Sequence, residues 1–245
     1  MNPDKVIGVG FTATVYEWEE GKVLKLFRQD FPKEAIEMEF RNARAVMDLP
    51  FSKPKAYELI HLDGRLGIVY DLMEGESLFD WVLRTGDLQQ CAIYMAELHK
   101  SILDIKVESV NNYKDCLRYF ISGIPDISER EGVLRILDRL PEGNTLCHGD
   151  FHPGNILLNQ GTTCIIDFMN ICHGHYLYDV ARTVYLVQYT PVYEEGEMRE
   201  QLLRFKKSLA DLYLIQMQVT REMIRDYLTV IKAARRIECP EEKVD

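Results

Sequence analysis

The sequence predicts an α+β fold with two lobes, a small antiparallel β-sheet lobe over residues 1–73 and a mostly helical lobe over residues 74–245. Apolar and polar side chains alternate as in strands before residue 74, and apolar side chains recur at helical spacing after it. The composition, 47% hydrophobic and 28% charged, is ordinary for a soluble globular protein. At 245 residues the chain also exceeds the roughly 150 residues of one typical domain.

The first lobe begins with a β-prone run around residues 15–18, an expected turn at 20–21 and a strand over 23–27. The period of two places Lys25 on the same face as the apolar odd-numbered residues of that strand. A lysine in such a setting is unusual, although a lysine on an edge strand is usually solvated. Lys25 is therefore a candidate functional residue.

A helix is expected next, because Pro32 suits a first helical turn and small or apolar residues then recur at helical spacing to about Leu49. Glu39 lies beside this apolar stripe. Residues 55–62 and 66–71 are predicted as strands, since the Asp-Gly pair between them is a strong hairpin signal.

The second lobe opens with an apolar helical stripe over residues 88–105. Ser128 and Glu131 have the spacing of a capping box, which predicts a helix start, and Pro141 ends that helix. The chain is predicted to be helical again from about residue 178, with a break near Pro191.

Charge and cysteine content limit the possible partners. The chain has 29 basic against 39 acidic residues, a net charge of −10, which disfavours nucleic-acid binding and suits a cationic partner. We expect no secretory leader and no membrane span, because the longest uncharged apolar-rich run, 183–193, is shorter than the about 20 residues that cross a bilayer. The six cysteines form no CxxC pair, as expected for reduced thiols in a cytoplasmic protein.

Two motifs in the second lobe carry chemistry: H-G-D-F-H-P-G-N over residues 148–155 and T-C-I-I-D-F over 163–168. Asp150 and Asn155 follow one short predicted strand and Asp167 ends the next, with a turn at 160–161 that brings Asn155 close to Asp167. Carboxylate and amide oxygens suit Mg²⁺, which completes its shell with phosphate oxygens. A further carboxylate can accept a proton from a substrate hydroxyl.

Upstream residues fit the same chemistry. Gly8 and Gly10 lie between two strand-like runs, where backbone N–H groups can approach phosphates. Lys25 can reach those phosphates, and Glu39 can pair with Lys25 and orient it. A glycine loop, a lysine, a glutamate, a base and metal ligands are together the parts needed for phosphoryl transfer.

With these residues in place, the chain resembles the aminoglycoside phosphotransferase and choline kinase-like families, which have a bilobal protein-kinase-like fold. The family signature H-G-D-x-x-x-x-N matches residues 148–155, and its I-D-[FW] matches residues 166–168. The resemblance implies that Asp150 is the catalytic base and that Asn155 and Asp167 hold Mg²⁺.

The same resemblance implies that Lys25 contacts the α/β-phosphates of ATP or GTP with Glu39 as its partner. It also implies that the segment from Tyr70 to Met73, including Asp71, contacts the adenine. The expected activity is phosphorylation of a hydroxyl on a small metabolite or an aminoglycoside-like compound. A protein substrate is disfavoured, since no Ala-Pro-Glu motif or activation loop follows Asp167.

Two alternatives stay open at this point, a nucleotide-binding regulator without turnover and a zinc-dependent hydrolase. The zinc hypothesis rests on four histidines close together in the sequence, His148, His152, His173 and His175. A structural interpretation of His148 is that it braces the loop. Asp179 and Arg182 are expected to pair and to hold the loop after Asp167.

Overall fold

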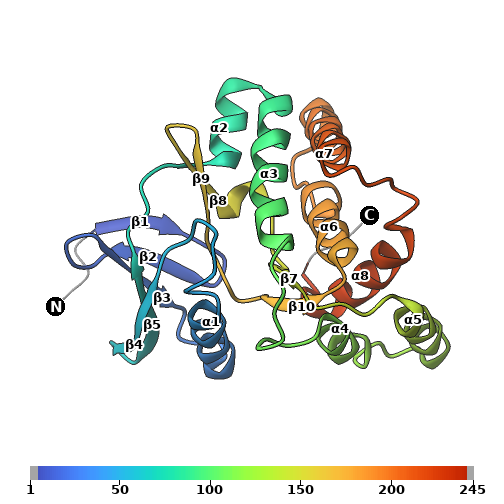
Figure 1. Ribbon diagram of the computed structural model, residues 1–245, viewed down its shortest axis with the longest axis horizontal. Coiled ribbons are helices and arrows are strands. Elements are labelled where there is room, and N and C mark those ends of the chain that lie inside the picture. The colour runs from blue at the N-terminus through green and yellow to red at the C-terminus, as the bar shows by residue number, and fades with distance from the viewer. Residues whose placement is uncertain (1–4, 242–245) are drawn as a thin grey trace. The chain divides into compact units, whose positions relative to one another are not determined.

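The computed structural model describes residues 5–241, and the chain divides into two units (Figure 1). Unit 1 consists of the residues up to 76 together with 157–170, and unit 2 consists of 77–156 together with the residues from 171 onward. The predicted boundary near residue 74 lies slightly before the structural one. Residues 1–4, where the sequence predicts no leader, and 242–245 lie outside the described range.

Unit 1 contains a five-stranded antiparallel sheet of order β1-β2-β3-β5-β4. Its strands are β1 (Lys5–Val9), β2 (Ala13–Glu17), β3 (Lys22–Phe27), β4 (Ala56–Leu62) and β5 (Arg65–Asp71). The predicted alternation is present in β3, where Leu24 and Leu26 are buried on one face against Val69 of β5. Because β3 pairs with β2 and β5, Lys25 is on a central strand and not on a solvated edge.

Helix α1 (Lys33–Ala45) follows Pro32 and packs against β4 and β5. It ends at Ala45, before the expected end at Leu49, because the chain turns from Val46 onward. Its buried face includes two polar residues, Glu39 and Asn42. Burial of polar side chains in this position implies that both have specific partners.

Residues 157–170 belong to unit 1, although the sequence prediction places them in the helical lobe. They include most of β8 (Ile156–Asn159) and all of β9 (Thr162–Ile165), which pair in a small sheet with β6 (Glu76–Ser77). The Ile165 N–H donates to the Ser52 carbonyl at 3.0 Å. Asn42 Nδ2 donates to the carbonyls of Phe168 and Met169 at 3.1 and 3.0 Å. These hydrogen bonds fasten the segment to unit 1.

Unit 2 is mostly helical, as predicted. Its helices are α2 (Leu78–Thr85), α3 (Leu88–Leu103), α4 (Tyr113–Ile121), α5 (Ile127–Arg139), α6 (Tyr176–Val184), α7 (Gly196–Met217) and α8 (Arg225–Glu238). Two short helical segments accompany them, a 3₁₀ turn η1 (Pro153–Asn155) and a π-helical segment η2 (Tyr185–Tyr189). Strands β7 (Thr145–Cys147) and β10 (Cys172–Gly174) pair antiparallel. Strand β10 is too short to show a sequence period.

The start of α5 differs from the prediction. Asp126, not Ser128, is the N-cap, and its carboxylate accepts the Glu129 N–H at 2.7 Å. Asp126 has extended backbone dihedrals, which a cap requires, whereas Ser128 is already inside the helix. The capping-box prediction is therefore wrong by two residues, while the helix does end just before Pro141.

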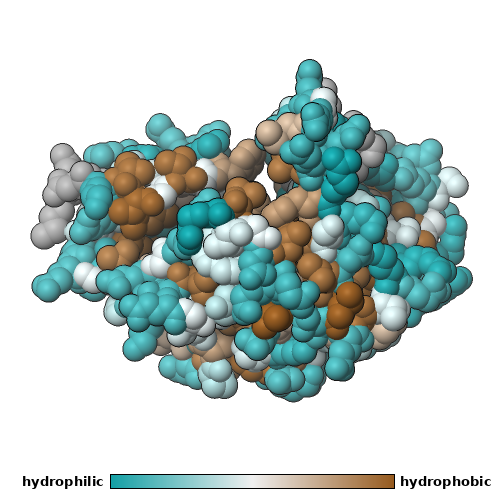
Figure 2. Space-filling model, turned by 90° about the horizontal axis from the view of Figure 1, so that it is seen from above, coloured by the Kyte–Doolittle hydropathy of each residue, from teal (hydrophilic) through white to brown (hydrophobic). Residues whose placement is uncertain are grey.

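Within residues 5–241, none of the helices is both long enough and apolar enough to cross a membrane. The face of the molecule in Figure 2 is largely hydrophilic, with apolar side chains gathered at the β1–β2 end of unit 1. There Val6, Val9 and Phe11 are exposed.

Gly75 is the glycine whose replacement we expect to be most damaging to unit 1. Its φ is +138°, and an added Cβ would lie 2.7 Å from the Leu158 carbonyl oxygen. Gly75→Ala should lower the free energy of unfolding by about 2 kcal/mol or more, through strain plus the clash. Gly64→Ala is the matched control, since Gly64 also has positive φ but has open space around it. The control should lose about 1 kcal/mol. Urea denaturation measures both, and equal losses would contradict the predicted clash.

Candidate active site

A buried ionic cluster joins three segments of unit 1. Lys25 Nζ of β3 lies 2.7 Å from Glu39 Oε1 of α1 and 3.2 Å from Asp167 Oδ2, beyond the end of β9. The exposed fractions of the side chains are 13% for Lys25, 0% for Glu39 and 31% for Asp167, so Asp167 is the member that solvent or a ligand can reach. The structure thus brings together three residues that the sequence predicts to act together.

The cluster has one ammonium against two carboxylates. Burial lowers the pKa of Lys25, but the charges of Asp167 and Glu39 outweigh it, so the net pKa is raised and Lys25 stays protonated. Burial raises the pKa of Glu39 to about 7, an effect that the charge of Lys25 only partly offsets. Tyr70 also donates its hydroxyl to Glu39 Oε1 at 3.0 Å.

The excess negative charge fits a cation near Asp167. Glu39 Oε2 is buried with no hydrogen-bond partner, so the cluster is not fully satisfied by protein groups alone. Asp167 itself has φ +69°, in the left-handed region that non-glycine residues adopt uncommonly. Asn42, which sequence reasoning missed, holds the two following carbonyls in place. An oxygen ligand presented in this way suits Mg²⁺.

The predicted glycine loop is the connection between β1 and β2. Gly8 lies next to an irregularity in the β1–β2 register, and the Gly10 N–H donates to the Ala13 carbonyl at 2.8 Å. Val9 and Phe11, between and after the glycines, are exposed. The structure places Gly8 within β1, paired with Val15 of β2, and Gly10 in the connection between the two strands, on the sheet that carries Lys25. Contact of either glycine with phosphate stays a prediction.

The segment predicted to contact adenine lies at the end of β5. The Asp71 carboxylate accepts the Tyr57 hydroxyl at 2.6 Å and the Lys55 N–H at 2.9 Å. The Asp71 N–H donates to the Lys55 carbonyl. The carboxylate and the N–H of Asp71 therefore both bind residues at or just before the start of β4. Met73 follows the strand end. Contact of Asp71 or Met73 with a nucleotide stays a prediction.

In unit 2, the H-G-D loop is held from α6. Asp179 accepts the N–H groups of His148 and Gly149 at 2.6 and 2.8 Å, and His99 Nε2 lies 2.9 Å from the same carboxylate. Burial alone would raise the pKa of Asp179, but the hydrogen bond from His99 and the further contacts lower it, so the carboxylate stays charged. Asp179 therefore fixes the backbone directly before Asp150.

This arrangement corrects the expectation for Asp179 and Arg182. They do not hold the loop after Asp167: Arg182 Nε donates to the Gly149 carbonyl, and Asp179 holds the N–H groups on the same loop. Arg182 pairs with Glu238 of α8, with Nη1 and Glu238 Oε2 3.0 Å apart. The sequence spacing indicated a bracing role but not the loop that is braced.

Asp150 and Asn155 are joined within unit 2. Asn155 Nδ2 donates to the Asp150 carbonyl at 2.9 Å and to Asp150 Oδ2 at 3.0 Å. Because the amide nitrogen is used on Asp150, its oxygen, Oδ1, is the atom left to act as a metal ligand. His152 Nε2 is 3.9 Å from Asp150 Oδ2, and His152 Nδ1 accepts the Gly154 N–H at 3.1 Å.

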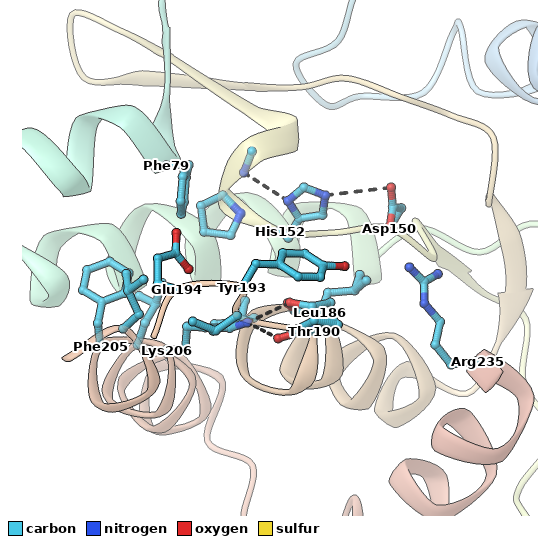
Figure 3. Close-up of a pocket in the computed structure, with 17 residues that line it drawn as sticks. Phe79, Asp150, His152, Leu186, Thr190, Tyr193, Glu194, Phe205, Lys206 and Arg235 are labelled. Carbon is cyan, nitrogen blue, oxygen red and sulfur yellow. Dashed lines mark hydrogen bonds and ion pairs between the residues drawn. The ribbon is translucent and has the colours of Figure 1, made fainter. Parts of the chain in front are cut away.

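The Asp150 side chain lies in the wall of a cavity of about 560 Å³ within unit 2. Figure 3 shows Asp150 and His152 on one side, Tyr193 across the middle, and Phe205 and Lys206 of α7 on the other side. A carboxylate in the wall of a cavity of this size can act as a base toward a small molecule bound there.

The four clustered histidines make separate contacts. His148 is buried, His173 Nδ1 lies 2.8 Å from the Val110 carbonyl, and His175 caps α6. Across the described residues 5–241, no three His, Cys, Asp or Glu side chains are placed to hold one metal ion. The geometry therefore does not support the zinc alternative.

Comparison with known proteins identifies a family. A family model described as "Phosphotransferase enzyme family" matches residues 5–207. No curated protein matches the chain significantly.

Solved structures show the same fold at low sequence identity. The amicoumacin kinase hAmiN, in complex with AMP-PNP, Ca²⁺ and Ami, is 19% identical, with a TM-score of 0.59 over 95% of this chain and 80% of the other. Aminoglycoside phosphotransferase APH(3'')-Id from Streptomyces rimosus, in complex with ADP and streptomycin, is 14% identical, with a TM-score of 0.62 and 90% of each chain covered. An aminoglycoside-3'-phosphotransferase of type VIII is 12% identical, with a TM-score of 0.63 over 93% and 92% of the two chains. The predicted kinase-like α+β fold class is confirmed.

The raised pKa of Glu39 predicts a pH-dependent stability in the absence of added metal. Between pH 4.5 and 7 the folded protein binds more protons at Glu39 than the unfolded chain does, so the Glu39 contribution to the free energy of unfolding falls as pH rises and levels off above 7. We expect the free energy of unfolding of the parent to fall more, from about pH 5 to about pH 8, than that of Glu39→Gln, which lacks the titrating carboxyl. Urea denaturation of both proteins at the two pH values measures this difference. Identical pH dependence in the two proteins would contradict the assignment.

Proposed function

The chain belongs to the phosphotransferase enzyme family, and from this premise we propose that it is a small-molecule kinase. The resemblance that the sequence motifs indicated is confirmed by that membership. The proposed reaction transfers the γ-phosphate of ATP or GTP to a hydroxyl group of a small metabolite or an aminoglycoside-like compound. One observation carries the proposal: Lys25 is largely buried on a central strand, between Glu39 and Asp167.

Lys25 and Glu39 act on the donor nucleotide in this proposal. Glu39 and Tyr70 fix the position of the ammonium, which then binds the α/β-phosphates as a point charge. Gly8 near the end of β1 and Gly10 in the β1–β2 connection would bring backbone N–H groups to the same phosphates. Asp71 and Met73 mark the segment proposed to contact the adenine. Solved structures with this fold hold ADP or AMP-PNP, which supports a nucleotide donor.

Asn155 and Asp167 are the proposed Mg²⁺ ligands, through the amide oxygen of one and the carboxylate of the other. They stand at the two open ends of the β8–β9 hairpin, and both supply the hard oxygen atoms that Mg²⁺ prefers. When bound, Mg²⁺ neutralises charge on the phosphates.

Asp150 is the proposed catalytic base. Its carboxylate is oriented by Asn155 and lies in the cavity wall, where it can accept the proton of an acceptor hydroxyl. The acceptor oxygen forms a bond to the γ-phosphorus as the bond from that phosphorus to the β-bridging oxygen breaks. The nucleoside diphosphate leaves, and the proton stays on Asp150.

The thiols support the predicted cytoplasmic location. Burial raises the pKa of Cys91 to about 12 and of Cys164 to about 11, so neither forms a thiolate readily. The six free cysteines suit a reducing compartment, which supports the proposed cytoplasmic location.

Asp150→Asn tests the base. Turnover should fall by about 10²-fold or more because the proton acceptor is lost, while the affinity for Mg-ATP should stay nearly unchanged. Nucleoside diphosphate release with an acceptor present measures the first quantity and calorimetry the second. Full activity in the variant would remove Asp150 from the mechanism. A parent protein that binds Mg-ATP without turning over any acceptor would favour the regulator alternative instead.

Asp167→Ala tests the metal ligand. Without this carboxylate, the Mg²⁺-dependent part of nucleotide affinity should be lost, so that titrations of ATP with Mg²⁺ and with EDTA become alike. Asp63→Asn, in the exposed β4–β5 turn, is the control and should keep the Mg²⁺ dependence. Unchanged Mg-ATP affinity in Asp167→Ala would contradict the metal role.

A further inference from the structure

The cavity beside Asp150 has mainly apolar walls. Its apolar lining includes Leu186 and Val187 of η2, Leu202, Phe205 and Leu209 of α7, and Phe79 of α2. A volume of about 560 Å³ lies within the range of sites that enclose a small organic molecule. Most of the surface of an occupant would therefore contact carbon.

The charged side chains of the lining balance one another. Asp150 and Glu194 are the acidic members, and Lys206 and Arg235 are the basic ones. Both basic side chains are anchored. Lys206 Nζ donates to Thr190 Oγ1 at 2.9 Å (Figure 3), and Arg235 Nη1 lies 3.2 Å from Glu238 Oε1. The cavity therefore has no surplus of negative charge, in spite of the net charge of −10 on the whole chain.

This balance bears on the class of acceptor. A molecule with several ammonium groups would lose hydration at each of them, and a cavity with two fixed cations cannot offer a carboxylate to each. An acceptor with an apolar body instead binds more tightly, because each methylene group that the cavity removes from water increases its affinity by up to about fourfold.

One positive charge can still be accommodated at the rim. Glu194 is exposed there, and the neighbouring Tyr193 is 78% exposed with its ring directed across the cavity (Figure 3). The exposed carboxylate attracts a single ammonium by charge, and the Tyr193 ring offers a second, separate attraction through its face.

We propose that the acceptor is a hydroxyl compound with a mainly apolar body and at most one net positive charge, not a polycationic sugar. This inference rests on the proposed function, since it takes the cavity at Asp150 as the acceptor site. It narrows the acceptor from any small hydroxyl compound to an amphipathic one.

A graded series of acceptors tests the proposal. Choline-like amino alcohols with lengthening N-alkyl or N-benzyl groups are compared with aminoglycosides carrying several ammonium groups. Binding is measured by calorimetry without nucleotide, and transfer by kcat/KM with Mg-ATP. The dissociation constant should fall by about twofold to fourfold per added methylene and depend weakly on salt.

Two variants on adjacent residues of α7 link the effect to the cavity. Leu202→Asp puts a charge in the cavity wall and should abolish the increase in binding affinity per added methylene group. Leu203→Asp is the matched control, because Leu203 is 41% exposed and is not among the lining residues. The control should keep the gain.

Tighter binding of aminoglycosides, with steep salt dependence and no gain along the alkyl series, would overturn the inference while leaving the kinase proposal intact. An equal loss in the two leucine variants would also overturn it. A binding gain along the series with no transfer to any acceptor would support an amphipathic ligand and count against the kinase proposal.

Discussion

The ion pairs of Lys25 are the interaction on which unit 1 depends. A buried ammonium is tolerated only where nearby carboxylates replace the water that it loses, and Lys25 has two such partners from different segments. That requirement sets the place of α1, which brings Glu39 to the sheet, and of the β8–β9 hairpin, which brings Asp167. Asn42, one turn from Glu39 on the same helix, then holds the chain after Asp167 by two hydrogen bonds. The same contacts leave Asp167 accessible and the cluster short of positive charge.

In unit 2 it is buried backbone groups, and not a charged side chain, that need polar partners. The loop before Asp150 runs through the interior, so its N–H groups need acceptors, and Asp179 supplies them from α6. The carboxylate is in turn paired with His99 of α3, which stacks on Phe151 with ring centroids 4.0 Å apart. The result is a loop whose shape is determined by buried groups behind it, with Asp150 in the wall of a cavity.

Local sequence patterns predicted several strands and candidate site residues. The alternation in β3 identified Lys25 as unusual, the Asp-Gly pair marked the β4–β5 hairpin, and the H-G-D motif identified Asp150 and Asn155 as candidates. What the sequence could not predict depends on tertiary contacts. The role of Asn42 appears only when α1 meets residues 168–169, and the choice of loop held by Asp179 depends on helix packing. Asp126 displaced Ser128 as a cap because two residues offered similar chemistry, and only the backbone dihedrals decide between them. The balance of charges in the cavity likewise depends on four separate segments, the loop at Asp150, the segment at Glu194, and helices α7 and α8, and no single stretch of sequence predicts it.

The discontinuity of unit 1 has a consequence for how the protein is made. Residues 157–170 emerge from the ribosome after the whole of α2 to α5. The five strands of the unit 1 sheet are therefore synthesised well before Asp167, and much of unit 2 is made in between. During that interval Lys25 has Glu39 as a partner but lacks its second carboxylate. A fragment that stops at residue 76 would keep this deficit permanently, so unit 1 is not separable by simple truncation and completes its folding only when the later segment joins it.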